Sequence, residues 1–575
     1  MSSAEHIAET VKLLALAHRL AQTGDHARAI ETYRAVAGRH PEAPAGWRQL
    51  AVAGAQHGMR PVAVAALKRS LTLAPDDRVA NRLLLYIDVA ADPAGRHRGL
   101  AMSALTDPGE ARAMARLASS YQLQDRTDPA ERCARQALAV NPGLVEVRVN
   151  LAVILRNKGE VAASRAELRR AAVLQPATLL TWRRIAIAEE LLSNLSDAEA
   201  AARRALAIDA RDHDAAIVQA FVQRRTGRIE TALLGLTALP DRLLGEIKRD
   251  VVEFELGALH DRQGKTEAAF DHFTRGNALA LARAAPGTAN AATYVAELRA
   301  HAQALSAPYV KRWQPMPPTD PPPVFMVGFP RSGTTLLDQV LDAHPAVRVL
   351  EELPILSAVA NRLARPHATL PERLAELTEP QVNQLRATYS ALLNRYAGAD
   401  APAMVIDKMP LNIALSGLIL RMYPNAKLIV SLRHPCDVCL SCFMQPFRLN
   451  PSMANFVDLD STTRLYALVM RIWLRARQAL SPDHVVVRYE DLIEDVEGHA
   501  RRTLAFLGLE WDDRVLGHLE HARSRGVIRT PSFRQVTEPI YKRARGRWHR
   551  YRTHLEPFMD RLDPFIDEFG YRDAP

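Results

Sequence analysis

A chain of 575 residues with a formal net charge of +10 is too long for one hydrophobic core, so we expect two or more domains. Its 48% hydrophobic and 24% charged residues are typical of a globular protein, and its four cysteines are too few for a disulfide scaffold. The sequence has no apolar run of about 18 residues and no signal-peptide pattern at its start, so we expect a cytoplasmic protein without a membrane span.

The first half of the chain carries prolines at a nearly constant interval. Pro41, Pro75, Pro108, Pro142 and Pro176 follow one another at 33 or 34 residues, the period of a helical repeat. Small and apolar residues keep the same phase, including Leu151, Ala152, Gly159, Leu168 and Ala171. The pattern resembles tetratricopeptide repeats over roughly residues 8–280. This resemblance implies an N-terminal all-α tetratricopeptide solenoid.

Such an array buries its apolar faces only when neighbouring repeats stack, and the stack presents a concave surface. Two interpretations of that surface stay open. It docks a protein or peptide partner, or it only scaffolds the chain or joins two copies as a homodimer. The net positive charge favours anionic ligands or acidic partners, but no basic-aromatic motif indicates nucleic acid.

A proline-rich segment separates the two halves of the chain. Seven of the 16 residues from Pro308 to Pro323 are prolines, which disfavour helix and strand and predict a stiff extended linker. We therefore divide the chain into a helical array at residues 1–305, a linker at residues 306–323 and an α/β domain at residues 324–575.

The α/β domain begins with a candidate phosphate-binding loop. Residues 324–327 are apolar and predict a buried strand, and a helical pattern starts near Thr334. The spacing Gly328-x-x-x-x-Gly333 between them is that of a P-loop, whose backbone N–H groups and helix dipole bind phosphate. Thr334 occupies the position of the Walker lysine, and the cation of the loop is Arg331. This change argues against ATP or GTP hydrolysis and for another phosphate-bearing donor.

Three further strands are predicted at residues 404–406, 427–432 and 484–488, with helical segments between them. This alternation is typical of a parallel sheet covered by helices on both faces. Ligands of such sheets bind at the carboxyl ends of the strands. Because Arg331, Lys408 and Arg433 each follow a strand end, we expect them to converge on one strongly anionic ligand.

The segment after the strand at 427–432 adds an arginine and, about two helical turns later, a hydroxyl group. Here the chain resembles the sulfotransferase family, whose donor is 3′-phosphoadenosine 5′-phosphosulfate (PAPS). The resemblance implies a C-terminal α/β P-loop-type sulfotransferase domain that releases 3′,5′-adenosine bisphosphate (PAP). It also implies that Arg433 and Ser441 hold the 3′-phosphate. The 5′-phosphosulfate is expected on Arg331, Ser332, Gly333, Thr334 and Thr335.

Within that family the likeness is to tyrosylprotein sulfotransferases, over about residues 322–572. The matching segments start at Pro330, Asp407, Tyr489 and Ser532. The likeness implies a general base at Glu352, sulfuryl contacts from Arg331, Lys408 and Ser532, and nucleotide contacts from Tyr489 and Arg547. The chain departs from the pattern in its repeats, in its expected lack of an anchor and disulfides, and in an arginine at 547 where a lysine is usual. The acceptor therefore stays open between protein tyrosine, carbohydrate, lipid and a small phenol.

The sequence leaves alternatives for the base. A phenol has a pKa of about 10, so a base in hydrogen-bond reach should assist its attack. Glu352 is our choice, with Glu351 turned elsewhere, although this acidic pair can also simply begin a helix. His344 and His434 are the alternative bases, and a cap or a loop-shaping role is a sufficient reason for each.

Two further features have simpler interpretations. Cys436, Cys439 and Cys442 have the spacing of a metal ligand set, but no fourth thiolate is near in sequence, so we predict no metal site. The P-loop spacing leaves a kinase-like phosphotransferase as an alternative function. An inactive repeat scaffold that senses nucleotide is the third hypothesis.

Overall fold

The computed structural model describes residues 111–518 except 124–125, 244–245, 286, 288–289, 364–367 and 399–400. It also describes residues 520–521, 544–572 and a discontinuous set between 12 and 83. The chain divides into two compact units, Met1–Ala188 and Glu189–Pro575, so the division falls inside the helical array. Our three-part division of the sequence stays a prediction.

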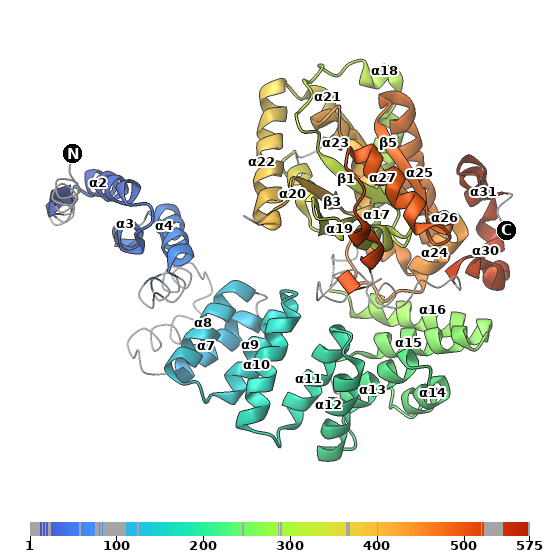
Figure 1. Ribbon diagram of the computed structural model, residues 1–575, viewed down its shortest axis with the longest axis horizontal. Helices are drawn as coiled ribbons and strands as arrows, with labels where there is room; N and C mark the ends of the chain where they lie inside the picture. The colour runs from blue at the N-terminus through green and yellow to red at the C-terminus, as the bar shows by residue number, and fades with distance from the viewer. Residues whose placement is uncertain are drawn as a thin grey trace. The chain divides into compact units, whose positions relative to one another are not determined.

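The first unit is built from antiparallel helix pairs, drawn in blue to cyan in Figure 1. Helices α9, α11 and α13 begin at residues 145, 179 and 213, so successive repeats start 34 residues apart, which confirms the period read from the prolines. Pro75 and Pro108 lie outside the described residues. The helices are α2 (His26–Arg39), α3 (Pro44–Gln56), α4 (Arg60–Leu73), α7 (Ala111–Leu123), α8 (Thr127–Val140), α9 (Val145–Asn157), α10 (Val161–Leu174) and α11 (Leu179–Leu191).

The in-phase prolines have a recurring partner. The indole Nε1 of Trp47 donates to the carbonyl oxygen of Pro41 at 3.0 Å, and that of Trp182 donates to Pro176 at 2.6 Å. Arg148 donates to the carbonyl of Pro142 in the same way, at 3.0 Å from its Nε. Each donor lies six residues after its proline, so one side chain of the next helix satisfies a carbonyl in the turn that enters it.

The second unit begins with the last helices of the array and continues into the α/β domain. Phe254 and Phe273 of the array are buried in the same apolar cluster as Phe325 and Val430 of the sheet. The array helices of this unit are α12 (Leu195–Ile208), α13 (His213–Arg225), α14 (Ile229–Thr237), α15 (Arg249–Arg262), α16 (Thr266–Arg283) and α17 (Ala291–Ala304). Of these, α15, α16 and α17 share a core with the α/β domain.

The sheet of the second unit has five parallel strands in the order β2-β3-β1-β4-β5. The neighbours β1 and β4 connect onward in opposite directions, β1 through α19 to β2 at one edge and β4 through α24 and α25 to β5 at the other. Ligands of open α/β sheets bind at such a switch point. The strands are β1 (Val324–Gly328), β2 (Val347–Glu351), β3 (Met404–Lys408), β4 (Lys427–Leu432) and β5 (Asp483–Arg488).

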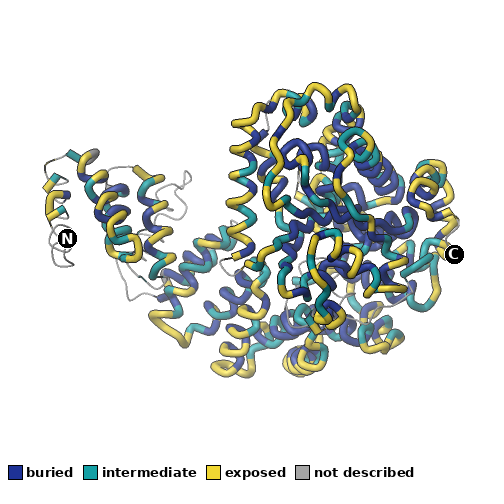
Figure 2. Tube along the Cα trace, turned by 45° about the horizontal axis from the view of Figure 1, so that its top comes forward, coloured by how far each residue is buried: buried dark blue, intermediate teal, exposed yellow. Residues whose placement is uncertain are grey.

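Helices cover both faces of the sheet, and the interior of the larger body in Figure 2 is accordingly mostly dark blue. On β1, Val324 and Met326 face a cluster built with α19 (Thr334–Asp342) and α27 (Val496–Leu507), whereas Phe325 and Val327 face the cluster shared with the array. The period-2 alternation of the strand thus supplies two cores. The second cluster includes α22 (Glu379–Ala397), α23 (Ser416–Met422), α24 (Pro435–Phe443), α25 (Leu459–Leu480) and α31 (Met559–Glu568).

The remaining elements of the second unit are short and lie in its connections. They are α18 (Ala307–Val310), α20 (Ile355–Arg362), α21 (Leu370–Glu376), η1 (Pro410–Leu415), η2 (Met453–Phe456), α26 (Tyr489–Leu492), η3 (Asp513–Gly517), η5 (Arg547–Tyr551), α30 (Arg552–Leu555) and η6 (Glu556–Phe558). None of the described helices is long and apolar enough to cross a membrane.

The parallel sheet confirms the predicted fold class, and two details differ from the sequence analysis. The strand β2 was missed, because two of its five residues, Arg348 and Glu351, are charged. The predicted linker is not wholly extended, since it begins with α18, where the buried Tyr309 donates to the carbonyl of Pro371 at 2.5 Å. Proline disfavours a helix interior but is tolerated in a first turn, where Pro308 lies.

Candidate active site

The loop after β1 has the backbone geometry of an anion cradle. Arg331 has φ 72° and Gly333 has φ 92°, so two residues of the loop are left-handed. Gly328 has no room for a side chain, because a Cβ there would lie 2.5 Å from the carbonyl oxygen of Ser431. Gly333 is the N-cap of α19 and offers no side chain to cap its first turn. The amide end of a nine-residue helix is therefore presented at the loop.

Arg433 and Ser441, the two predicted contacts of the 3′-phosphate, both bond to Arg331. Its Nε donates to Ser441 Oγ at 3.1 Å, and its carbonyl oxygen accepts from Nη1 of Arg433 at 3.2 Å. Arg331 is 9% and Arg433 7% exposed. The loop after β1, the residue after β4 and α24 therefore form one connected group at the switch point of the sheet.

Lys408, the last residue of β3, is fully buried between carboxylates. Its Nζ lies 2.9 Å from Asp338 Oδ2 and 3.5 Å from Glu352 Oε1. Burial lowers the pKa of Lys408, but the charges of Asp338, Glu352 and Glu351 outweigh it and hold the pKa above its ordinary value. Lys408 is therefore a fixed positive charge in a dry site.

The two adjacent glutamates at the end of β2 have different surroundings. Glu351 is buried, and its Oε1 accepts from Nε2 of Gln339 at 3.0 Å. Glu352 has a left-handed backbone, with φ 47°, and its amide donates to the carbonyl oxygen of Lys408 at 2.7 Å. Its side chain keeps 28% of its surface exposed. Only Glu352 of the pair combines contact with Lys408 Nζ with access to solvent.

Tyr489 contacts Arg433, and Arg547 contacts Met444 at the end of α24. A Cβ on Gly333 would lie 2.7 Å from Tyr489, and the Arg433 guanidinium lies 4.7 Å from the centre of the Tyr489 ring. Arg547 contacts the last turn of α24 through Met444 Sδ at 3.6 Å and forms an ion pair with Asp261 at 2.9 Å. The predicted sulfuryl contact Ser532 lies outside the described residues.

The two alternative bases have structural partners. His344 accepts from the amide of Ala346 at Nδ1, 3.1 Å away, and its Nε2 lies 3.0 Å from the carbonyl oxygen of Glu510. His434 is the N-cap of α24, where its Nδ1 accepts from the amide of Cys436. Burial lowers the pKa of His434 to about 4 despite the opposing charge of Glu490, which makes it a weak base.

The cysteine motif lies inside the domain. Cys436, Cys439 and Cys442 are free and buried along α24, and burial raises the pKa of each thiol. Cys442 Sγ donates to the carbonyl oxygen of Pro330 at 3.4 Å. No group of three or more potential metal ligands occurs among the residues that the structure describes.

Three buried polar residues of the site were not predicted from the sequence. Asp338 bonds to Lys408, and Asp437 accepts from the amides of Gly546 and Trp548 at 2.7 and 2.9 Å. Asp407 accepts from the Tyr389 hydroxyl at 3.1 Å, and burial raises its pKa to about 7 despite that hydrogen bond. A carboxylate next to apolar residues, Leu337 before Asp338 and Val438 after Asp437, was the available signal.

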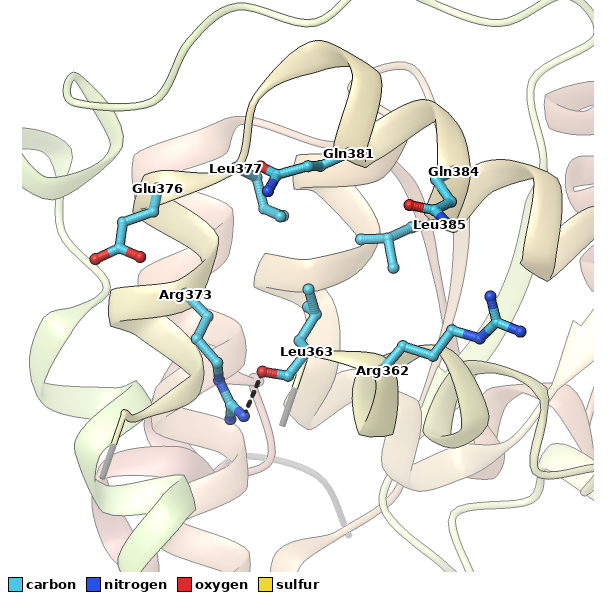
Figure 3. A pocket seen from close by; sticks show the side chains of 8 residues that line it. All are labelled: Arg362, Leu363, Arg373, Glu376, Leu377, Gln381, Gln384 and Leu385. Carbon is cyan, nitrogen blue, oxygen red and sulfur yellow. Dashed lines mark hydrogen bonds between the residues drawn. The ribbon is translucent and has the colours of Figure 1, made fainter. Parts of the chain in front are cut away.

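A pocket of about 360 Å³ lies apart from these residues (Figure 3). It is formed by α20, α21 and α22, and Nη1 of Arg373 donates across it to the carbonyl oxygen of Leu363 at 2.7 Å. The pocket lies at the Arg362 end of α20, whereas Glu352 comes before the other end of this helix. At a rise of about 1.5 Å per residue the two ends of α20 are about 12 Å apart. The pocket contains none of the predicted site residues.

Comparisons with known proteins match both parts of the chain. Residues 322–513 match the model of the sulfotransferase family, and residues 12–53 match a tetratricopeptide repeat. An uncharacterised protein of Aquifex aeolicus is 31% identical over 274 residues, which cover 44% of this chain and 35% of that protein. The protein-tyrosine sulfotransferase of Drosophila melanogaster is 28% identical over 243 residues, which cover 40% of this chain and 47% of that enzyme.

The chain thus spans less than half the length of either relative. Among solved structures, the crystal structure of MamA is 16% identical and covers 29% of this chain and 89% of its own, with a TM-score of 0.25. The family matches, the 34-residue helical period and the five-stranded parallel sheet identify the two parts of the molecule. The chain joins a helical region that matches a tetratricopeptide repeat to a C-terminal domain that matches the sulfotransferase family, with similarity to protein-tyrosine sulfotransferases.

Proposed function

We propose that the protein transfers a sulfuryl group from PAPS to a hydroxyl acceptor, with Glu352 as the general base. The observation that carries this proposal is the position of Glu352 beside Lys408. Lys408 ends β3 and Glu352 directly follows the neighbouring strand β2, so that Lys408 Nζ lies 3.5 Å from Glu352 Oε1 while the carboxylate stays partly exposed. A base next to a fixed cation suits an acceptor that loses a proton as it attacks a negatively charged group.

The residues at the switch point suit a donor with two separate anionic groups. The amide end of α19 and the left-handed loop at Arg331 and Gly333 offer one binding position. Arg433 and Ser441, which flank Arg331, offer a second one. The absence of a side chain at Gly333 leaves the space that a Cβ would fill in front of Tyr489. Thr334 in place of a Walker lysine disfavours ATP as the donor.

The chemical step asks little of the protein beyond position and charge. The bound donor supplies the sulfuryl group, and PAP is the leaving group. Glu352 takes the proton of the acceptor hydroxyl as its oxygen bonds to sulfur in an in-line attack and the sulfur–oxygen bond to the phosphate breaks. Lys408 and Arg331 stabilise the negative charge that develops on the bridging oxygen of the leaving nucleotide. Asp338 keeps Lys408 charged and in place.

Protein tyrosine is the acceptor that we propose. The Drosophila relative is named for this acceptor, and a repeat array is a common way to bind an extended partner. The array therefore serves as the docking surface for the protein substrate in this proposal. Location in the cytoplasm and a homodimer stay predictions.

Two measurements on the purified full chain test the proposal. Calorimetric titration should show PAP binding tighter than 5′-AMP by at least about 10-fold, because 5′-AMP lacks the 3′-phosphate that Arg433 and Ser441 are proposed to hold. Incubation with PAPS labelled in the sulfuryl group and a lysate of the source cells should place the label on protein tyrosine. Tighter binding of ATP than of PAP would favour a kinase-like enzyme, and PAP binding without any transfer would favour an inactive nucleotide sensor.

A further inference from the structure

Asp261 carries a buried carboxylate from the repeat array into the α/β domain. It lies near the end of α15, is 4% exposed and faces the C-terminal segment of the chain. Its Oδ2 pairs with Nη2 of Arg547 at 2.9 Å, and its Oδ1 accepts from Nη2 of Arg550 at 3.0 Å and from the Tyr551 hydroxyl at 2.8 Å. One carboxylate of the array thus binds three side chains of η5.

The other side of the same segment is held by the proposed donor site. Nη2 of Arg433 donates to the carbonyl oxygen of Ala544 at 2.5 Å. Asp437, in the first turn of α24, accepts from the amides of Gly546 and Trp548. The Trp548 indole stacks on His434 with ring centres 5.0 Å apart. Residues 544–551 therefore lie between α15 of the array and α24 of the α/β domain.

Arg547 contacts both α15 and the end of α24. Its Nη2 reaches Asp261, and its Nη1 reaches Met444 at the end of α24, the helix that carries Ser441. Arg547 and Arg550 share one carboxylate, so two guanidinium groups are held close together only while that negative charge is present. Removal of the charge would drive the two arginines apart and move Arg547 relative to α24.

We propose that Asp261 is a positioning residue of the donor site and that the hairpin α15–α16 is an integral part of that site. The inference rests on the proposed use of PAPS and extends it to the repeat array. A second contact supports it, since Asn277 of α16 donates from Nδ2 to the carbonyl oxygen of Phe443 in α24 at 2.9 Å, and both residues are buried. The last hairpin of the array thus sets the position of α24 as well as that of Arg547.

The chain offers a matched control on the same helix. Asp250 is also 4% exposed, but it pairs with Arg283 of α16 at 2.5 Å, inside the hairpin. The test compares the PAP affinity of the full-length wild type, Asp261→Asn and Asp250→Asn by calorimetry. We expect Asp261→Asn to weaken PAP binding by about 10-fold and Asp250→Asn to change it by less than about 2-fold. Equal affinities, or an equal loss in both variants, would overturn the inference.

A double substitution tests whether Asp261 acts through Arg547. We expect Asp261→Asn to cause no further loss of PAP affinity in the Arg547→Gln background, whereas a merely structural role would give additive losses. Arg547→Gln alone leaves Asp261 bonded to Arg550 and Tyr551, so it decides the matter if Asp261→Asn does not fold. Unchanged PAP affinity in Arg547→Gln then overturns the inference, because Asp261 would have no effect on the donor site to transmit through Arg547.

The outcomes also separate this inference from the proposed function. A wild-type chain that does not bind PAP overturns both of them. A wild-type chain that binds PAP as tightly as Asp261→Asn does overturns the role of Asp261 alone.

Discussion

The repeat helices and the α/β domain bury charged groups in different ways. In the second unit, Glu255 pairs with Arg224 and Glu190 with Arg225, at sequence separations of 31 and 35 residues, about one repeat. In the α/β domain, Arg331 bonds to Ser441 and Arg433 to Ala544, at separations of 110 and 111 residues. A charged residue of one repeat finds its partner in a neighbouring repeat. The residues of the site, by contrast, are brought together by the order of the strands in the sheet. The site should therefore be the less tolerant of the two when one partner is removed.

The largest effect is expected at Lys408, which pairs with two carboxylates from other elements. In Lys408→Met, Asp338 remains buried without its opposite charge, so the free energy of unfolding should fall by about 3–5 kcal/mol. Sulfuryl transfer should fall by about 10³-fold because a fixed cation is lost. Urea unfolding and transfer from labelled PAPS measure the two losses.

The double variant Lys408→Met/Asp338→Asn separates the loss of stability from the loss of sulfuryl transfer. Neutralising Asp338 removes the unpaired charge, so part of the lost stability should return while transfer stays low. Recovery of transfer in the double variant would contradict a catalytic role for Lys408.

A smaller effect on stability, with a large one on catalysis, is expected at Glu352. Its side chain is partly exposed, so Glu352→Gln should fold normally and bind PAP within about 2-fold of the wild type, while the turnover number falls by about 10²–10⁴-fold. Glu351→Gln is the matched control, because Glu351 is the adjacent carboxylate but bonds to Gln339. Equal losses of turnover in the two variants would sink the assignment of the base.

The same contrast explains what could be predicted from the sequence. The 34-residue period, β4 and the start of α19 at Thr334 are local patterns, and each was predicted at or near its observed residues. The strand order was not predictable, and with it the pairing of Lys408 with Asp338 and of Arg547 with Asp261. From the sequence alone, a charged residue in a helix is expected to be solvated, because only the fold shows which strand end lies beside it. The sequence predicted Arg433 and Ser441 as a pair, and the fold places both against Arg331.

Buried titratable groups of the second unit differ in whether a charged partner or burial sets the pKa. Burial raises the pKa of Glu253 in α15, but His272 and Arg249 outweigh it and bring the pKa down to about 2. Burial lowers the pKa of His301, in α17 beside Gly417, to about 4 despite the opposing carbonyl of Ala414. As the pH falls from 6.5 towards 4, the unfolded chain binds a proton that folded His301 excludes, so stability is lost. Asp407, with a pKa of about 7, acts in the opposite direction, since its stabilising proton is lost as the pH rises towards 7.

In the variant His301→Gln, Asp407 still titrates but residue 301 does not, so comparison with the wild type isolates the contribution of His301. Between pH 7.5 and pH 5 the wild type should lose about 2 kcal/mol more of its free energy of unfolding than His301→Gln does, because glutamine does not titrate. Urea midpoints at the two pH values measure the difference. Parallel pH profiles would show that His301 is accessible to protons in the folded protein.

The smallest effect is expected at Glu131 of the first unit. It pairs with Lys158 at 2.6 Å, with 15% and 27% of the two side chains exposed, and Lys158 also has Asp128 at 3.2 Å. Glu131→Gln should therefore cost about 1 kcal/mol or less and leave PAP affinity unchanged. In about 1 M salt the Debye length is about 3 Å, close to the separation of this partly exposed pair, so the loss should shrink further. The loss in Lys408→Met should persist at the same salt, because ions do not reach a fully buried pair. Equal salt sensitivity of the two losses would mean that the array and the site bury charge in the same way.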